Sequence, residues 1–206
     1  MSKSLACFSL VLAMLAGTEV ARAYDLSRQD IGQGVDIERG FVTGQISLWL
    51  PGDGPFYDYH QTSLDFGAEF GFRVASVHGH NFFVVAGMTI SPQKLDPRYV
   101  DPDYANSVIW VGFAGVRYIP AMLCIGDGVG CPFAELRFGL MFEHDDGDSE
   151  YDGPTVDFAV QPGIGYRFRF GEAVQVGARM DVSFIEDEDT EYLGWVTFGA
   201  FAGFSW

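Results

Sequence analysis

Apolar and polar residues alternate with a period of two along much of the chain. The clearest stretch covers residues 64–74 and reads LDFGAEFGFRV, in which every second residue is apolar and the residues between them are Asp65, Gly67, Glu69, Gly71 and Arg73. Successive side chains of a β-strand point to opposite faces, so this period predicts a strand with one apolar and one polar face. A soluble β-barrel and a lipid-embedded barrel share the pattern and differ in which face meets water.

Eight stretches of the chain fit the alternating pattern, and each is long enough to cross a bilayer as a tilted strand, which takes ~9–11 residues. They cover residues 41–50, 63–75, 81–91, 107–119, 133–143, 155–170, 173–185 and 193–206. The third and fourth stretches are apolar on both faces, so their orientation is less clear. The sixth contains Pro162, which has no amide hydrogen for a ladder, and we expect a bulge or a gap in hydrogen bonding there.

The connections between these stretches alternate in character. Those after the first, third, fifth and seventh are acidic, aromatic or both, whereas those after the second and sixth are short. Long loops on one side and tight turns on the other are typical of outer-membrane barrels. The connection PAMLCIGDGVGCP breaks the rule by its length. It contains Cys124 and Cys131, and a disulfide between them would add roughly 2 to 3 kcal/mol on the chain-entropy model.

Two arguments turn the apolar face outward. Large aromatic side chains on every strand would overfill the interior of an eight-stranded barrel, whereas glycine and paired charges fit it. The charges of the polar face are also nearly balanced, as an enclosed interior requires, because an unpaired buried ion is costly. The predicted lumen network contains Asp65, Glu69, Arg73, Arg117, Glu135, Arg137, Asp157, Arg167, Arg169, Arg179 and Asp181. A soluble lipocalin-like barrel with these charges on its outer face is the alternative.

The N-terminus predicts export from the cytoplasm. Lys3 precedes the apolar run LACFSLVLAMLAG, and Ala21-Arg22-Ala23 forms an A-x-A cleavage site, so we expect a signal peptide over residues 1–23. Residues 24–39 are then a periplasmic N-terminal segment, and residues 40–206 form the barrel domain. The formal net charge of −16 argues against nucleic acid as a partner.

The whole mature sequence resembles the small eight-stranded outer-membrane barrels of the OmpA/OmpX type. The sharpest local match is the C-terminal FGAFAGFSW, in which Phe204 and Trp206 share one face of the last strand. The resemblance implies an all-β, antiparallel, up-and-down transmembrane barrel in the cell outer membrane. It also implies a monomer in contact with outer-membrane lipid and lipopolysaccharide, and recognition of Phe204 and Trp206 by the barrel-assembly machinery.

Residues for catalysis or metal binding are sparse. No histidine is followed two residues later by serine, as in the outer-membrane lipid A deacylases, and His60 and His144 are the only histidines near the long loops. His78-Gly79-His80 offers two metal ligands, too few for a strong site. The acidic loop after the fifth stretch begins like an EF-hand but has Ala159 where the bidentate acid belongs. Weak candidates for divalent cations remain at Asp148, Glu150 and Asp152.

These observations favour a non-enzymatic outer-membrane barrel without a cofactor, which has a structural role or meets other surfaces through its acidic loops. Three alternatives stay open: a narrow channel, a lipid-modifying enzyme of the outer membrane, and a soluble exported ligand-binding barrel.

Overall fold

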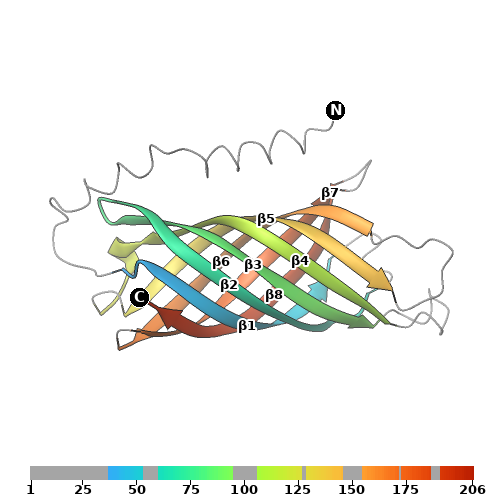
Figure 1. Cartoon of the computed structure of the whole chain (residues 1–206), viewed down its shortest axis with the longest axis horizontal. Helices are drawn as coiled ribbons and strands as arrows, with labels where there is room; N and C mark the ends of the chain where they lie inside the picture. Colours follow the sequence, from blue (N-terminus) through green and yellow to red (C-terminus); the bar gives the residue numbers. More distant parts are fainter. Residues whose placement is uncertain are drawn as a thin grey trace.

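The computed structural model describes residues 37–52, 60–94, 106–126, 129–145, 155–171, 173–186 and 191–206. Eight strands form one closed barrel in which each strand pairs with the next and the last pairs with the first, all antiparallel (Figure 1). The strands are β1 Gly40–Pro51, β2 Ser63–Val77, β3 His80–Lys94, β4 Asn106–Pro120, β5 Gly130–Asp145, β6 Thr155–Phe170, β7 Val174–Glu186 and β8 Glu191–Ser205. The predicted fold class and all eight predicted strands are confirmed.

A 3-10 turn, η3 (Ala121–Leu123), follows β4. Within the described ranges, no helix combines the length and the apolar character needed to cross a bilayer.

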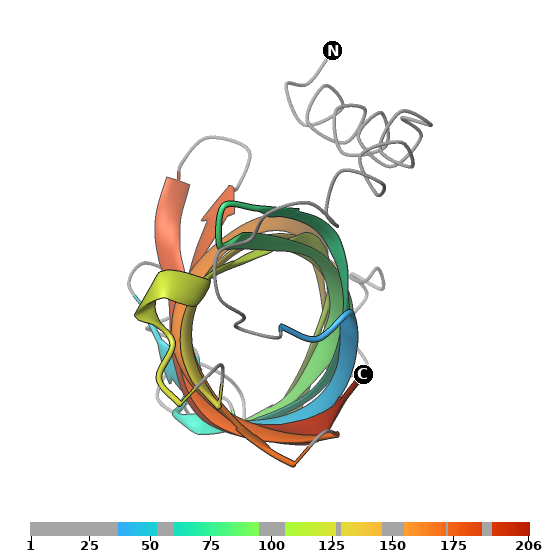
Figure 2. The same cartoon turned by 90° about the vertical axis from the view of Figure 1, so that its left-hand side faces the viewer.

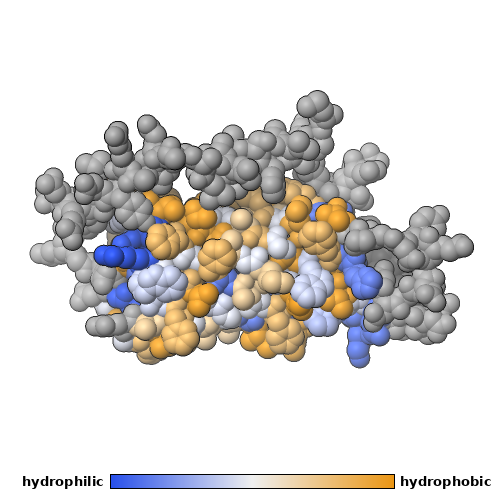
Figure 3. All heavy atoms as spheres, viewed as in Figure 1, coloured by the Kyte–Doolittle hydropathy of each residue, from blue (hydrophilic) through white to orange (hydrophobic). Residues whose placement is uncertain are grey.

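The two faces of the barrel wall differ in polarity as the alternation predicts. On β2, Phe66, Phe70 and Phe72 are 45%, 57% and 49% exposed, whereas Asp65 and Glu69 between them are buried. Exposed apolar side chains on all eight strands form an apolar belt, and on the face drawn in Figure 3 they occupy the middle of the barrel, with hydrophilic residues towards its two ends. This exposed apolar belt belongs in lipid, which excludes the soluble barrel with a polar outer face.

The described strand ends define two ends of the barrel. The terminal end contains the start of β1, the end of β8, the tight turns at His78-Gly79 and at Gly171, and η3 (Figures 1 and 2). The loop end contains the strand ends that flank the four acidic connections. Each strand crosses from one end to the other, so all four connections start from and return to the loop end.

The seam between β1 and β8 closes the barrel and involves the last residue of the chain. The carbonyl oxygen of Trp206 accepts hydrogen bonds from the amides of Arg39 and Gly40, at 2.5 and 3.0 Å. The indole of Trp206 lies against Gly40, where an added Cβ would come within 2.6 Å of the ring. Glycine at position 40 therefore lets the terminal aromatic ring lie flat on the first strand.

Pro162 has the predicted gap in hydrogen bonding. The register of β6 with β7 pairs Val160 with Phe184 and resumes at Gly163 with Asp181, so Gln161 and Pro162 have no ladder partner on that side. The side chain of Gln161 spans the gap, because its amide nitrogen donates to the Ser183 hydroxyl at 3.0 Å. The ladder with β5 continues through both residues, so the barrel stays closed.

Phe70 tests the assignment of the two faces. It lies midway along β2 on the outer surface, so Phe70→Arg places a charge in the lipid and should lower the free energy of unfolding by ~2–4 kcal/mol. Phe70→Leu keeps the site apolar and should have a small effect. Equilibrium unfolding in denaturant, with the protein in lipid vesicles, measures both; equal stability of the two variants would contradict the outward assignment.

Candidate functional site: the charged lumen

Glycine residues on the inner face of the wall make room for side chains that reach in from neighbouring strands. At Gly67 an added Cβ would lie 2.8 Å from Thr89 Cγ2 and 2.9 Å from Gln45 Nε2, so the neighbouring strands have already filled that space. Gly163 has the same role beside the carboxylate of Asp181. The lumen of eight strands holds side chains and little else, and these two glycines leave the space that Gln45, Thr89 and Asp181 occupy.

Three arginines and three acids form a network in the middle of the lumen: Glu69, Arg117, Glu135, Arg137, Arg179 and Asp181. The six side chains come from β2, β4, β5 and β7 and are 1% to 5% exposed. The formal charges balance, so the network is neutral as a whole. A neutral, mutually hydrogen-bonded set is the form in which charge can be buried without a large penalty.

Arg179 is the hub of this lumen network. Its guanidinium donates to both carboxylate oxygens of Asp181 at 2.9 and 3.1 Å, to Glu69 at 3.1 Å and to Glu135. It also donates to the amide oxygen of Gln45 at 3.2 Å. One side chain thus connects β7 with β1, β2 and β5 across the barrel.

The other two arginines have acidic partners and aromatic neighbours. Arg117 donates to Glu69 and Glu135, and its guanidinium lies 4.3 Å from the ring centre of Phe41 and 4.4 Å from that of Phe133. Arg137 pairs with Asp181 at 2.9 Å and lies 4.4 Å from the ring centre of Phe113. Rings on the faces of the guanidinium groups stabilise them in a space from which water is excluded.

An apolar layer closes the lumen at the terminal end. It contains Ile37, Phe41, Phe83, Val85, Ile119, Ala121, Cys131, Phe133 and Phe201. Ile37 precedes β1 and is 2% exposed, and its carbonyl oxygen accepts a hydrogen bond from Arg73 at 2.6 Å. Ile37 and Glu38 therefore belong to the closure of the lumen, whereas Arg39, the last residue of the segment predicted to be periplasmic, is exposed.

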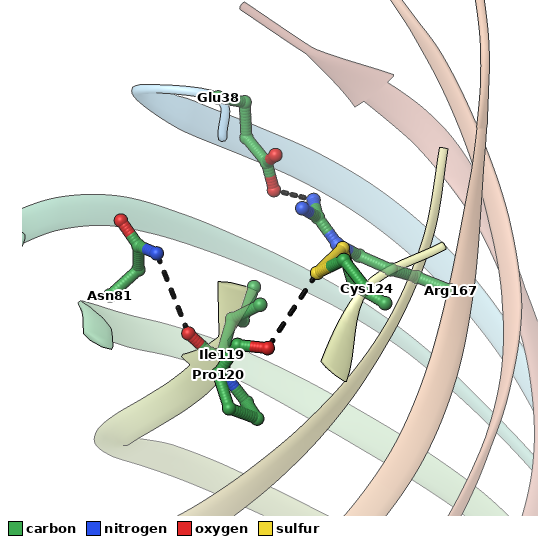
Figure 4. Close-up of a disulfide and its surroundings, with 7 residues drawn as sticks. Glu38, Asn81, Ile119, Pro120, Cys124 and Arg167 are labelled. Carbon is green, nitrogen blue, oxygen red and sulfur yellow. Dashed lines mark hydrogen bonds and ion pairs between the residues drawn. A yellow bond between two sulfur atoms is a disulfide. The ribbon is translucent and has the colours of Figure 1, made fainter. Parts of the chain in front are cut away.

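Glu38 extends this closure with an ion pair to Arg167, close to the disulfide (Figure 4). Both side chains are 1% exposed. The pair lies apart from the central network. Arg167 therefore neutralises the charge of Glu38, a residue outside the eight predicted strands.

A second apolar layer closes the lumen at the loop end and contains Trp49, Ile109, Val111, Met141, Ala159, Ile185 and Trp195. The two indole rings stack with their centres 5.9 Å apart. Outside this layer, His60 bonds to Glu143 at 2.7 Å, and the Ser107 hydroxyl donates to the same carboxylate oxygen at 3.1 Å.

The aromatic residues of the two layers correct one expectation. Large rings were assigned to the outer face because they would overfill the lumen, yet Phe41, Phe83, Phe133 and Trp49 are among its buried residues. The rings fit because they lie towards the two ends, while glycine lines parts of the wall between them. One feature of the sequence indicated these layers: the third and fourth predicted strands are apolar on both faces.

The eleven residues predicted for the lumen network divide into four groups. Six form the central network, and buried Asp65 lies on the inner face of β2 and is hydrogen-bonded to Thr89. Arg167 pairs with Glu38 instead. Arg73, Asp157 and Arg169 lie nearer the strand ends and are only half-buried, outside the network.

The geometry of the histidines offers little for catalysis. In the group of His60, Glu143 and Ser107, both other side chains bond to the same carboxylate oxygen, so these hydrogen bonds do not place the imidazole as a base on the serine hydroxyl. His80 is hydrogen-bonded to the hydroxyl of Tyr118 at 2.6 Å. Among the residues that the structure describes, no three His, Cys, Asp or Glu side chains could hold a metal ion together. Asp148, Glu150 and Asp152 lie outside the described residues.

The predicted disulfide between Cys124 and Cys131 is confirmed. It ties the turn after β4 to the start of β5, beside the apolar layer of the terminal end (Figure 4).

Comparison with known proteins shows which solved structures share this fold. No protein-family model and no curated protein matches the chain. Neisserial surface protein A is similar in structure, with a TM-score of 0.51 and 11% identity over 79% of this chain and 95% of that one. Ail of Yersinia pestis, solved in complex with the heparin analogue sucrose octasulfate, has a TM-score of 0.50 and 11% identity over 81% of this chain and 97% of that one.

At this identity the likeness is one of fold. The chain has the fold of the small eight-stranded outer-membrane barrels, as its sequence predicted, and its apolar belt and filled polar lumen suit a protein embedded in the outer membrane.

Arg179 tests whether the lumen network holds the barrel together. Arg179→Met leaves three buried carboxylates short of a partner and should lower the free energy of unfolding by ~3–5 kcal/mol. Arg39 is exposed at the rim, and Arg39→Met should change stability by less than about 0.5 kcal/mol. Denaturant unfolding in lipid vesicles measures both. An equal loss of unfolding free energy in the two variants would show that the lumen network does not stabilise the barrel.

Proposed function

We propose that the protein is a non-enzymatic component of the outer membrane, whose barrel conducts nothing and which acts through the acidic connections at its loop end. One observation carries this proposal: the lumen is filled along its length by an apolar layer, a neutral charged network and a second apolar layer. A barrel without a path through its centre is a rigid support for what lies at its ends.

The filled lumen favours this reading over the narrow channel. An ion entering from the loop end would have to pass between the stacked rings of Trp49 and Trp195 and then displace carboxylates already paired with arginines. Transfer of a hydrated ion into such a space is costly without compensating partners.

The placement of polar groups also favours a non-catalytic role over the lipid-modifying enzyme. Among the described residues, His60, Glu143 and Ser107 come nearest to a catalytic group. His60 and Ser107 both bond to Glu143 and not to each other in these hydrogen bonds, so the imidazole does not activate the serine hydroxyl as a nucleophile. His80 is on the outer surface, paired with Tyr118 beside the ring of Phe82. An aromatic and polar pair of this kind fits the girdle at the edge of the lipid.

The acidic connections support a surface role for the loop end. Residues 53–59, 95–105, 146–154 and 187–190 contain two, three, four and three acidic residues, and Arg98 is their one basic residue. So strong an excess of one sign attracts cations and basic surfaces and repels polyanions. We place the terminal end of the barrel on the periplasmic side, so in this proposal these connections face the outside of the cell.

We expect no steady ion conductance from the purified protein in planar bilayers, because side chains occupy the whole lumen. Recordings at neutral pH and over a range of voltages test this directly. Discrete steps of uniform size from the wild-type protein would favour the channel and contradict the proposal.

The sign of the surface charge gives a second test. In lipid nanodiscs, the protein should bind an oligolysine peptide, and salt should weaken this binding because it screens exposed charges. Sucrose octasulfate, the polyanion in the Ail structure, should not bind. Asp148→Asn, Glu150→Gln and Asp152→Asn together should weaken oligolysine binding, while the exposed-site change Arg39→Met should not.

Isothermal titration compares these affinities. Binding of sucrose octasulfate that equals binding of oligolysine, or oligolysine binding that the neutralised loop leaves unchanged, would count against a surface role based on these charges.

A further inference from the structure

The turn between β4 and β5 exposes four apolar side chains within eight residues of the chain, 122–129. Met122, Leu123, Ile125 and Val129 are 62%, 61%, 60% and 46% exposed. The described residues of this turn, 121–126 and 129–131, are uncharged, and the one charged residue in its sequence is Asp127. We refer to the four side chains as the apolar foot. Surface turns are usually polar, so four exposed apolar side chains in one turn indicate a contact with something apolar.

The disulfide fixes the direction in which the apolar foot points. Cys131 is fully buried, and Cys124 packs against the apolar layer of the terminal end. Next to the disulfide, Ile125 and Gly130 exchange two backbone hydrogen bonds, at 2.7 and 3.1 Å. Neighbouring side chains of an extended strand point to opposite sides, so Ile125 faces away from the lumen while Cys124 faces towards it.

The foot is continuous with the lipid-facing surface of the barrel. A Cβ added at Gly130, on the outer face, would lie 2.9 Å from Ile125 Cγ1 and 2.7 Å from the hydroxyl of Tyr166. Ile125 and Tyr166 therefore flank the same point of the outer wall. The ring of Tyr166 in turn lies 4.9 Å from the ring of Phe168, which is 41% exposed on that wall.

The other side of the turn is anchored to the neighbouring tight turn. The amide of Ala121 donates to the carbonyl oxygen of Gly79 at 2.8 Å, and Val77, at the end of β2, is 53% exposed. Figure 2, which looks onto the terminal end, shows η3 at the rim of the wall, directed outward from the ring of strands. The turn therefore does not serve as a lid over the lumen.

We propose that the apolar foot inserts into the lipid leaflet that surrounds the terminal end of the barrel. Its continuity with the aromatic residues Tyr166 and Phe168 places it at the edge of the lipid, where amphipathic rings lie at the level of the headgroups. The occupant of this surface is phospholipid. The disulfide keeps the side chains ordered towards the bilayer, so little conformational entropy is lost when they insert.

Methionine methyl groups provide a direct test, because four methionines follow the predicted signal peptide: Met88, Met122, Met141 and Met180. The protein is labelled with 13C at these methyls and placed in phospholipid nanodiscs. Met88 is 46% exposed in the apolar belt and reports contact with lipid, whereas Met141 is fully buried in the lumen. Met122→Leu removes one signal and so assigns it.

Two paramagnetic probes separate lipid from water. With phospholipids that have a nitroxide on the acyl chain, the Met122 signal should be lost together with that of Met88, while Met141 persists. With a water-soluble gadolinium chelate, Met122 should persist. A stronger effect of gadolinium than of the labelled lipid would overturn the proposal, as expected if the foot awaits a protein partner. Protection from both probes would also overturn it, because another part of the chain would then cover the foot.

A pair of variants links the result to the foot itself. Leu123→Asp with Ile125→Asp should restore the Met122 signal in labelled lipid and leave Met88 and Met141 unchanged, which also shows that the barrel is folded. The matched apolar control, Leu123→Val with Ile125→Val, should behave like wild type. Continued loss of the Met122 signal in the aspartate variant would contradict insertion by these side chains.

Discussion

The structure depends on the burial of balanced charge inside a closed wall. Three arginines and three acids are buried together in the lumen, so each charge is tolerable only while its partners are in place. Because the six side chains come from four strands, one set of contacts fixes the relative positions of β2, β4, β5 and β7. Loss of strand register would separate these charges, so the network opposes misregistered pairings as well as unfolding.

The rest of the barrel follows from this constraint. Glycine at inner positions leaves space for polar side chains such as Gln45 and Asp181, and apolar layers cover the ion pairs at both ends. The terminal layer is completed by Ile37, which precedes the first strand. Outside, the apolar belt faces lipid and the seam at Gly40 and Trp206 closes the wall. The side chains that stabilise the barrel also leave no path for ions through it. A function of the protein is therefore to be sought at the two ends of the barrel.

The period-two pattern was enough to predict the strands and the orientation of β2. The missing amide hydrogen of Pro162 predicted the interruption of the ladder, and the close pair Cys124 and Cys131 in an exported chain predicted the disulfide. It could not predict the rings in the lumen, because whether Phe41 or Phe83 fits inside depends on which inner residues the tilt of the strands brings to the same level. It also could not predict that Glu38, outside every alternating stretch, would pair with Arg167. Partner choice across a barrel depends on register, and single-strand periodicity contains no information on register.

The exchange of arginine side-chain protons tests most directly whether the lumen is dry and its charges paired. In lipid nanodiscs at neutral pH, the Nε–H groups of Arg117 and Arg179, which donate to Glu135 and Asp181, should give nitrogen-15 signals that exchange slowly with water. The exposed Arg39 should exchange too fast to be seen. Fast exchange at Arg117 and Arg179, equal to that of Arg39, would mean that water reaches the network and would contradict the sealed, charge-paired lumen.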